Sequence, residues 1–241
     1  AVQALAPYYF SNKSYTYVNA KTGETLTKTV RQVVEEALDR LGSLQREAGD
    51  FASWGTVNSE STAQVLVALT ALGINPAEDD RFITGTGKTL LDGLLQYRTA
   101  NGGFSHTIGG GWNSMANDQA AYALVAYWRL ENGMRSLYDI RDDWTVEERG
   151  AIQAAREAVS ALPTPEDSGY KAALKAALAV FRQVPETERQ YVYEYGDLAK
   201  AIDMVGGEEA LDTDAPYVTG ITVTALPSKL QYWEGETFDP A

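Results

Sequence analysis

The feature that most constrains the fold of this chain is an internal repeat. A segment that starts at Asn58-Ser59 reappears at Asn113-Ser114, and each copy continues with the same residue types at the same positions. The pairs that match at an offset of 55 positions are Asn58 and Asn113, Ser59 and Ser114, Gln64 and Gln119, Ala68 and Ala123, Leu69 and Leu124, and Ala71 and Ala126. Such a repeat is typical of arrays in which each unit packs on its neighbours.

A second pair of similar segments precedes these two copies. Leu44-Gln45 leads to Gly49-Asp50-Phe51, and Leu95-Gln96 leads to Gly102-Gly103-Phe104. The repeating unit is therefore a helix, a glutamine, a glycine-containing turn with an aromatic residue, a polar loop and a second helix. Because one such hairpin cannot bury its apolar face alone, we predict stacked helical hairpins.

Local signals place the helices of this region. Apolar residues recur at helical spacing in the segments 30–44, 61–72 and 91–95. Gly73 and Pro76 predict the end of the middle helix, because glycine favours the left-handed cap and proline cannot continue a helix. Ser59 or Ser61 is expected to cap its start.

The repeated glutamines stand within otherwise apolar helical stripes. A polar group in a buried stripe needs a hydrogen-bond partner. We therefore predict that Gln64 and Gln119 occupy equivalent places on inward-facing helices and that each side-chain amide bonds backbone in a neighbouring turn.

A different pattern begins after Tyr138. Thr145 and Glu148 have the spacing of a capping box, and three amphipathic stripes separated by proline or glycine follow. The stripes are Ile152, Ala155, Val159 and Leu162, then Tyr170, Leu174, Leu178 and Phe181, then Tyr191, Tyr195, Leu198, Ile202 and Val205. Short breakers between amphipathic helices favour an antiparallel three-helix bundle.

The hydrophobic period changes to two from Tyr217 onward, which indicates the first strands of a β-sandwich. The predicted class is therefore all-α, with stacked hairpins, a three-helix bundle and a short β-like C-terminal tail. The predicted domains are 1–139, the repeat domain; 140–212, the bundle; and 213–241, a linker with the first strand or strands of a further domain.

Charge and composition exclude several classes of partner. The formal net charge is -13, with 20 Lys and Arg against 33 Asp and Glu, so no basic footprint for nucleic acid is present. No apolar run approaches the roughly 20 residues that span a bilayer, so membrane insertion is not expected. The chain starts at Ala1 within an apolar, helix-like stretch, which favours a piece of a longer protein.

The repeat unit resembles a known family. Gln45 to Phe51 and Gln96 to Phe104, each followed by Asn-Ser and a helix with Ala-Leu-x-Ala, resemble the repeat of the prenyltransferase and squalene-cyclase α/α-toroid superfamily. The likeness is greatest to the non-catalytic version in large surface proteins of Gram-positive gut anaerobes. It covers about residues 1–139, and its most specific string is Asn58 to Gln64.

Two later segments carry similar resemblances. The segment from Ala151 to Ala201 is similar to small three-helix modules of the same surface proteins, and Val218 to Pro227 resembles the opening of a bacterial immunoglobulin-like domain. This order implies a secreted, cell-wall-associated modular protein. For such a module we expect a recognition role, with a host or environmental glycan, or a host protein such as an immunoglobulin or mucin, as the partner.

The catalytic residues of the toroid enzymes are not matched here. The chain has no cysteine and only His106, whereas protein prenyltransferases hold zinc with Asp, Cys and His. It also lacks the Asp-x-Asp-Asp motif with which squalene-type cyclases protonate their substrate. We therefore expect no metal, no organic cofactor and no catalytic residue.

The two polar loops before the repeated helices provide the candidate ligand-binding residues. They are Trp54, Asn58, Glu60, His106, Trp112, Asn113 and Asp118. Aromatic rings beside amides and carboxylates suit the faces of sugars or an apolar patch of a protein. The alternative is structural, in which the tryptophans pack the turns between hairpins and the asparagines cap helices.

Two other function classes remain open. Some α/α-toroid polysaccharide lyases combine Asn, His, Tyr and Arg, and this chain offers His106 near Trp112, before Tyr122 and Arg129. A carbohydrate-active lyase or hydrolase is therefore one alternative. A structural spacer that recognises nothing is the other.

The repeat count predicts an open face. Full toroids close about six hairpins, whereas this chain has two recognisable repeats and the stub from Ala1 to Tyr9. A large apolar face is seldom left bare. We expect the bundle or the C-terminal tail to fold back on the hairpins, or else self-association or a separate N-terminal segment to cover the open face.

Overall fold

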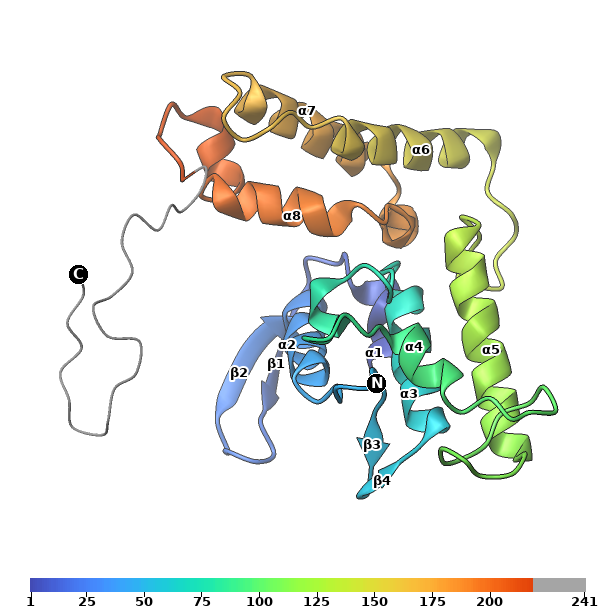
Figure 1. Cartoon of the computed structure of the whole chain (residues 1–241). Coiled ribbons are helices and arrows are strands. Elements are labelled where there is room, and N and C mark those ends of the chain that lie inside the picture. Colours follow the sequence, from blue (N-terminus) through green and yellow to red (C-terminus); the bar gives the residue numbers. More distant parts are fainter. Residues whose placement is uncertain (219–241) are drawn as a thin grey trace, which may run out of the picture.

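The computed structural model describes residues 1–218 and is mostly helical, with two small antiparallel two-stranded sheets (Figure 1). The predicted all-α class is confirmed in the coarser form of a mostly helical fold. The predicted β-like tail falls almost entirely on residues 219–241, outside the described residues.

The N-terminal elements include a β-hairpin that the sequence reading missed. The elements are α1 (Val2–Leu5), η1 (Ala6–Tyr8), β1 (Ser14–Val18) and β2 (Thr25–Thr29). Tyr15 and Tyr17 alternate with threonine and valine, which is a strand pattern. The register pairs Ser14 with Thr29 and Val18 with Thr25.

The repeat region follows. Its elements are α2 (Val30–Gly42), β3 (Ala52–Ser53), β4 (Thr56–Val57), α3 (Ser59–Ala71), η2 (Asp80–Phe82), α4 (Leu90–Leu95) and α5 (Ser114–Glu131). Helix α3 is buried on nearly every side, because α1, α4 and α5 all pack against it. It ends as predicted, with Leu72 as the cap and Gly73 at a φ of 76°.

Helices α3 and α5 pack with their equivalent faces toward each other, and this corrects the prediction for the glutamines. Gln64 donates from Nε2 to Oε1 of Gln119 at 3.0 Å and also to the hydroxyl of Tyr122, and neither side chain is buried. The prediction of backbone partners was wrong. The repeated position thus meets its own copy across the helix pair, and Gln64 donates to Gln119.

The C-terminal elements form a second core. They are α6 (Val146–Ser160), α7 (Tyr170–Gln183), η3 (Glu186–Tyr191), α8 (Tyr195–Met204) and η4 (Glu208–Asp212). The Thr145 and Glu148 capping box is present, and the predicted apolar stripes supply the buried side chains. The third predicted helix is divided, because the chain turns at Val192 before α8 begins.

The bundle packs on the N-terminal elements. Phe10 contacts Tyr195 and Phe181, with ring centroids 4.8 and 5.8 Å apart. Gly73 lies so close to the carbonyl oxygen of Gln190 that an added Cβ would stand 2.1 Å from it. Of the two segments that were expected to fold back, the bundle therefore does so. The outer face of α5 is not covered by it, and Met115 and Trp128 remain exposed there.

Candidate functional site

The two polar loops of the repeats lie side by side at the N-terminal ends of α3 and α5. We call residues 52–57 the first loop and residues 105–112 the second loop. The Ser59 backbone N–H donates to the carbonyl of His106 at 3.2 Å, and the Ser59 hydroxyl donates to the carbonyl of Ser105 at 2.9 Å. The second loop is therefore anchored to the start of α3, and Ser59 is not a helix cap.

The turns beneath the loops share a left-handed glycine, and both preceding glutamines bond the first of these turns. Gly49 and Gly102 have φ values of 88° and 89°, a conformation that glycine adopts without strain. The Gln45 side-chain amide donates to the carbonyl of Gly49 at 3.1 Å, and that of Gln96 donates to the carbonyl of Ala48 at 2.7 Å. The repeated glutamines before the turns are thus structural.

A buried carboxylate distinguishes the first repeat. Asp50 has no exposed surface and accepts hydrogen bonds from the Tyr97 hydroxyl at 2.8 Å and from Arg46 at 3.1 Å. Burial and the hydrogen bond to Asp50 raise the pKa of Tyr97 above its ordinary value. The matched position in the second repeat is Gly103, so this network has no counterpart there.

Asn58 and Asn113 are helix caps. Asn58 Oδ1 accepts from the backbone N–H of Ser61 at 2.8 Å, and Asn113 Oδ1 accepts from that of Ala116 at 3.0 Å. These oxygens satisfy donors that a helix start leaves unpaired. The structural alternative therefore accounts for both asparagines, and they cap α3 and α5 in place of the serines.

Glu60 and His106 form a contact between the two repeats. Nδ1 of His106 lies 2.9 Å from both carboxylate oxygens of Glu60. The Glu60 side chain is 13% exposed and the His106 side chain is 49% exposed. The carboxylate thus fixes the ring, and the far side of the imidazole remains open to solvent.

Trp54 stands at the tip of the first loop. It is fully exposed and has a φ of 52°, and Gly55 follows with a φ of 79°. Positive φ at both central residues is the requirement of a type I′ hairpin turn, for which Asn-Gly is the favoured pair. Among residues 1–218, Trp54 is the sole residue other than glycine with positive φ.

Trp112 does not occupy the position that matches Trp54. It pairs with Ser105 across the base of the second loop, as Val57 pairs with Ala52 in the first. Its ring lies on Gly103, where an added Cβ would stand 2.3 Å from Cδ1 of the indole. The side chain is nevertheless 62% exposed.

The remaining predicted residues lie apart from the loops. Asp118 is exposed on α5 and makes no side-chain hydrogen bond or ion pair within the part of the chain that the structure describes. Arg129 bonds the carbonyl of Arg135. At about 1.5 Å of rise per residue, Arg129 lies about 24 Å along α5 from Asn113. The lyase-like residue set therefore does not converge around His106.

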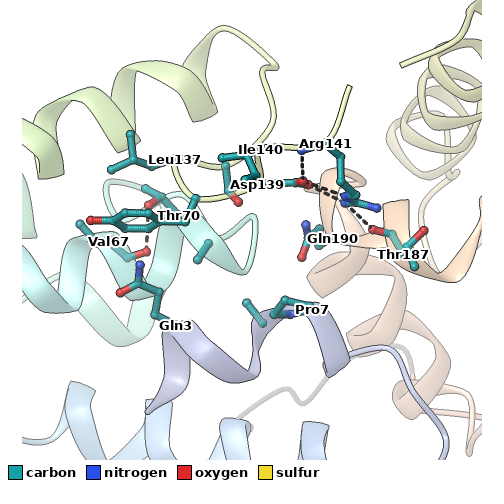
Figure 2. Close-up of a pocket in the computed structure, with 14 residues that line it drawn as sticks. Gln3, Pro7, Val67, Thr70, Leu137, Asp139, Ile140, Arg141, Thr187 and Gln190 are labelled. Atoms are coloured by element: carbon teal, nitrogen blue, oxygen red, sulfur yellow. Dashed lines mark hydrogen bonds and ion pairs between the residues drawn. The ribbon is translucent and has the colours of Figure 1, made fainter. Parts of the chain in front are cut away.

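The sequence reading missed a cavity of about 410 Å³ between the repeat region and the bundle (Figure 2). The segment after α5 covers it, and α1, η1, α3 and η3 form the other walls. No local signal could have found it, because its walls come from segments far apart in the chain. In residues 1–218, no group of three or more His, Cys, Asp or Glu side chains could hold a metal ion.

Comparison of the chain with protein-family models, with curated proteins and with solved structures found no match. Within residues 1–218, no helix is both long enough and apolar enough to cross a membrane.

Proposed function

We propose that this chain is a non-catalytic recognition module of a secreted or wall-anchored bacterial surface protein. Its binding surface is the loop surface, which we define as Trp54, Glu60, His106 and Trp112. The ligand that we favour is a glycan of host or environmental origin. A host protein, such as an immunoglobulin or mucin, is the other partner considered.

The observation that carries this proposal is the conformation of Trp54. A bulky residue with positive φ costs on the order of 1–2 kcal/mol, and a fully exposed indole regains nothing by burial in this chain. Strain of this kind is typical of ligand-binding sites. A ligand that covers the indole would recover the apolar area left in water.

The neighbouring groups favour a glycan over a protein. Glu60 and His106 give a fixed carboxylate and a solvent-facing imidazole edge, while Trp54 and Trp112 give exposed aromatic faces. Sugars present apolar ring faces bordered by hydroxyl groups, which match this combination. A stable protein interface needs about 800 Å² on each partner, which two short loops do not readily supply.

The proposal extends to the architecture. The α3 and α5 units, with their matched caps, turns and facing glutamines, support the assignment of residues 1–139 to a partial α/α toroid. The exposed outer face of α5 is where a further hairpin or a second copy of the chain would pack. Under this proposal, 140–212 is the surface-protein bundle and 213–241 the start of an immunoglobulin-like domain.

A glycan array that also carries mucin and immunoglobulin tests the proposal, with wild-type chain and two variants. Trp54→Ala should lose at least about tenfold in affinity for any ligand found, since an exposed aromatic anchor is worth on the order of 1.5–2 kcal/mol. Trp128→Ala is the matched control, because Trp128 is also exposed but lies at the far end of α5.

The outcomes separate the alternatives. Binding to mucin peptide or immunoglobulin without glycan would make the partner a protein. Equal loss in both variants, or none in Trp54→Ala, would remove the loop surface from the proposal. Absence of binding to any glycan or protein would favour the structural spacer.

The contact between Glu60 and His106 gives some support to a second candidate, a carbohydrate lyase. A carboxylate that orients an imidazole is what a general base needs. Turnover of uronic-acid polymers, followed by the absorbance of the unsaturated product and abolished in His106→Ala, would establish this activity and reject the non-catalytic proposal.

A further inference from the structure

The cavity between the repeat region and the bundle has walls from four separate parts of the chain. In Figure 2, Leu137 and Ile140 lie above it, Val67 and Thr70 on one side, Gln3 and Pro7 below, and Thr187 and Gln190 on the other side. Its volume of about 410 Å³ falls in the range of small-molecule sites, roughly 300–1,000 Å³.

Most of the surface that faces the cavity is apolar. Seven of the fourteen lining residues supply it, namely Ala6, Pro7, Val67, Ala71, Leu137, Tyr138 and Ile140. Tyr138 and Ile140 line the cavity and yet remain 63% and 94% exposed. Two large apolar side chains at the mouth of an apolar hollow leave area that a bound molecule would remove from water.

The charged groups in the wall are paired with one another. Asp139 accepts from Arg141 at 2.7 Å and from the Tyr191 hydroxyl at 2.6 Å, and Arg141 also donates to Glu188 at 2.6 Å. Burial alone would raise the pKa of Asp139, but the hydrogen bonds from Arg141 and Tyr191 outweigh it and hold that pKa well below its usual range. The wall thus offers no uncompensated charge to a ligand.

One buried polar side chain lacks a partner. Gln190 is 6% exposed, lines the cavity, and makes no side-chain hydrogen bond within residues 1–218. In that part of the chain, every side-chain polar atom that is fully enclosed has a hydrogen-bond partner. Because the Gln190 amide has none, its polar atoms are not fully enclosed and reach open space. Its backbone is held in place by the close approach of Gly73. Gln3 on the opposite wall is likewise without a side-chain partner among these residues.

We propose that this cavity binds a small uncharged molecule, largely apolar, that carries an amide, carbonyl or hydroxyl group facing Gln190. An amide side chain both donates and accepts, so it recognises any of these groups. A charged ligand is disfavoured, because it would leave water for an apolar hollow whose charges are already paired. This site is separate from the loop surface and does not depend on the proposed glycan binding.

Three indole compounds that differ in charge test the proposal: indole-3-acetamide, indole-3-acetate and tryptamine. Saturation-transfer NMR titrations measure their binding to the whole chain. Indole-3-acetamide should give saturable binding, and the two ions should bind at least about tenfold more weakly. No saturable binding of the amide, or equal binding of all three compounds, would overturn the proposal.

Variants locate the binding. Ala71→Phe places a ring in the cavity and should abolish binding of indole-3-acetamide, while Ala121→Phe makes the same change on the exposed face of α5 and should leave it intact. Gln190→Met should weaken binding about tenfold through loss of the amide.

A substitution at the mouth of the cavity tests the site without changing the packing of a wall. Ile140 is almost wholly exposed, so Ile140→Asp should fold normally and weaken indole-3-acetamide binding severalfold through lost apolar contact. Thermal melts verify the fold of each variant. Unchanged binding in both folded Ala71→Phe and Ile140→Asp would place the probe elsewhere and reject the site.

Discussion

The first and second loops start and end in the same way but present different side chains. Each follows a glycine with φ near 90° and a phenylalanine, and each ends at an asparagine that caps a helix. The second loop is two residues longer, which is why the repeat offset increases from 53 at the phenylalanines to 55 at the asparagines.

The difference shows which parts of the repeat are structural. The first loop closes as a tight hairpin with Trp54 at its tip, whereas the longer second loop carries His106 to Glu60 and lays Trp112 on Gly103. The turns and caps are the shared structural elements. The loops themselves differ, and together with Glu60 at the start of α3 they carry the groups that we assign to recognition.

The largest expected effect is a difference in stability loss between alanine substitutions at the two turn glycines, Gly49 and Gly102. A Cβ on Gly49 would stand 2.3 Å from the carbonyl oxygen of Thr89, whereas one on Gly102 meets no atom within 4 Å. Gly102→Ala should cost about 1 kcal/mol from positive φ alone. Gly49→Ala should cost about 3 kcal/mol or more, since backbone must also move. Urea denaturation measures both, and equal losses would mean that the two turns are packed alike.

The next effect concerns Asp50, which has no match in the second repeat. Asp50→Ala leaves the Tyr97 hydroxyl and Arg46 without their acceptor and should cost about 2–3 kcal/mol in urea denaturation. Tyr97→Phe removes one hydrogen bond and should cost about 1 kcal/mol. A loss below that of Tyr97→Phe would show that the carboxylate does not tie the first repeat to the second.

The same network gives a pH dependence. The pKa of Tyr97 is raised above its ordinary value of 10.0 by burial and by Asp50. The folded state therefore keeps this proton longer than the unfolded state, and the associated stability falls as the pH rises above about 10. Each pH unit changes this contribution by at most about 1.4 kcal/mol. Tyr97→Phe should lose stability less steeply from pH 9 to 11, and an unchanged slope would contradict the assignment.

The two caps should behave alike. Asn58→Ala and Asn113→Ala should each cost about 1 kcal/mol in urea denaturation. The loss should be somewhat larger for Asn58, which also donates to the carbonyl of Thr56 at 2.9 Å. Neither substitution should change ligand affinity in folded protein. A loss of affinity as large as that of Trp54→Ala would show that the asparagines take part in ligand binding.

The smallest expected effect is a gain in stability, in contrast to the losses above. Trp54→Asn places the favoured Asn-Gly pair in the first hairpin turn and should raise stability by about 0.5–1 kcal/mol while it lowers ligand affinity. Ala replacement of Trp112 should not stabilise the chain, since that ring packs on Gly103. A destabilised Trp54→Asn would mean that the indole is packed and not presented for binding.

The sequence by itself determined the features that depend on residues close together in the chain, namely helix ends, caps and turns. The helix of 59–71 with Gly73 after it, the capping box at Thr145 and the paired turns before Phe51 and Phe104 could all be predicted. The reason is that caps, turns and amphipathic stripes act within a few residues. The hairpin of 14–29 was also readable from its alternation, although it was not predicted.

The tertiary structure decided every pairing between distant segments. Gln64 meets Gln119 because α3 and α5 present equivalent faces to each other, and Glu60 meets His106 because the second loop is anchored on α3. The mismatch of the two tryptophans was already readable from the sequence, since Trp54 lies four residues before Asn58 and Trp112 directly precedes Asn113, but the contact of Trp112 with Gly103 appears only in the structure. The cavity near Gln190 exists because the bundle packs on η1 and on the turn that follows α3. Such contacts depend on how whole elements pack, which no spacing along the chain specifies.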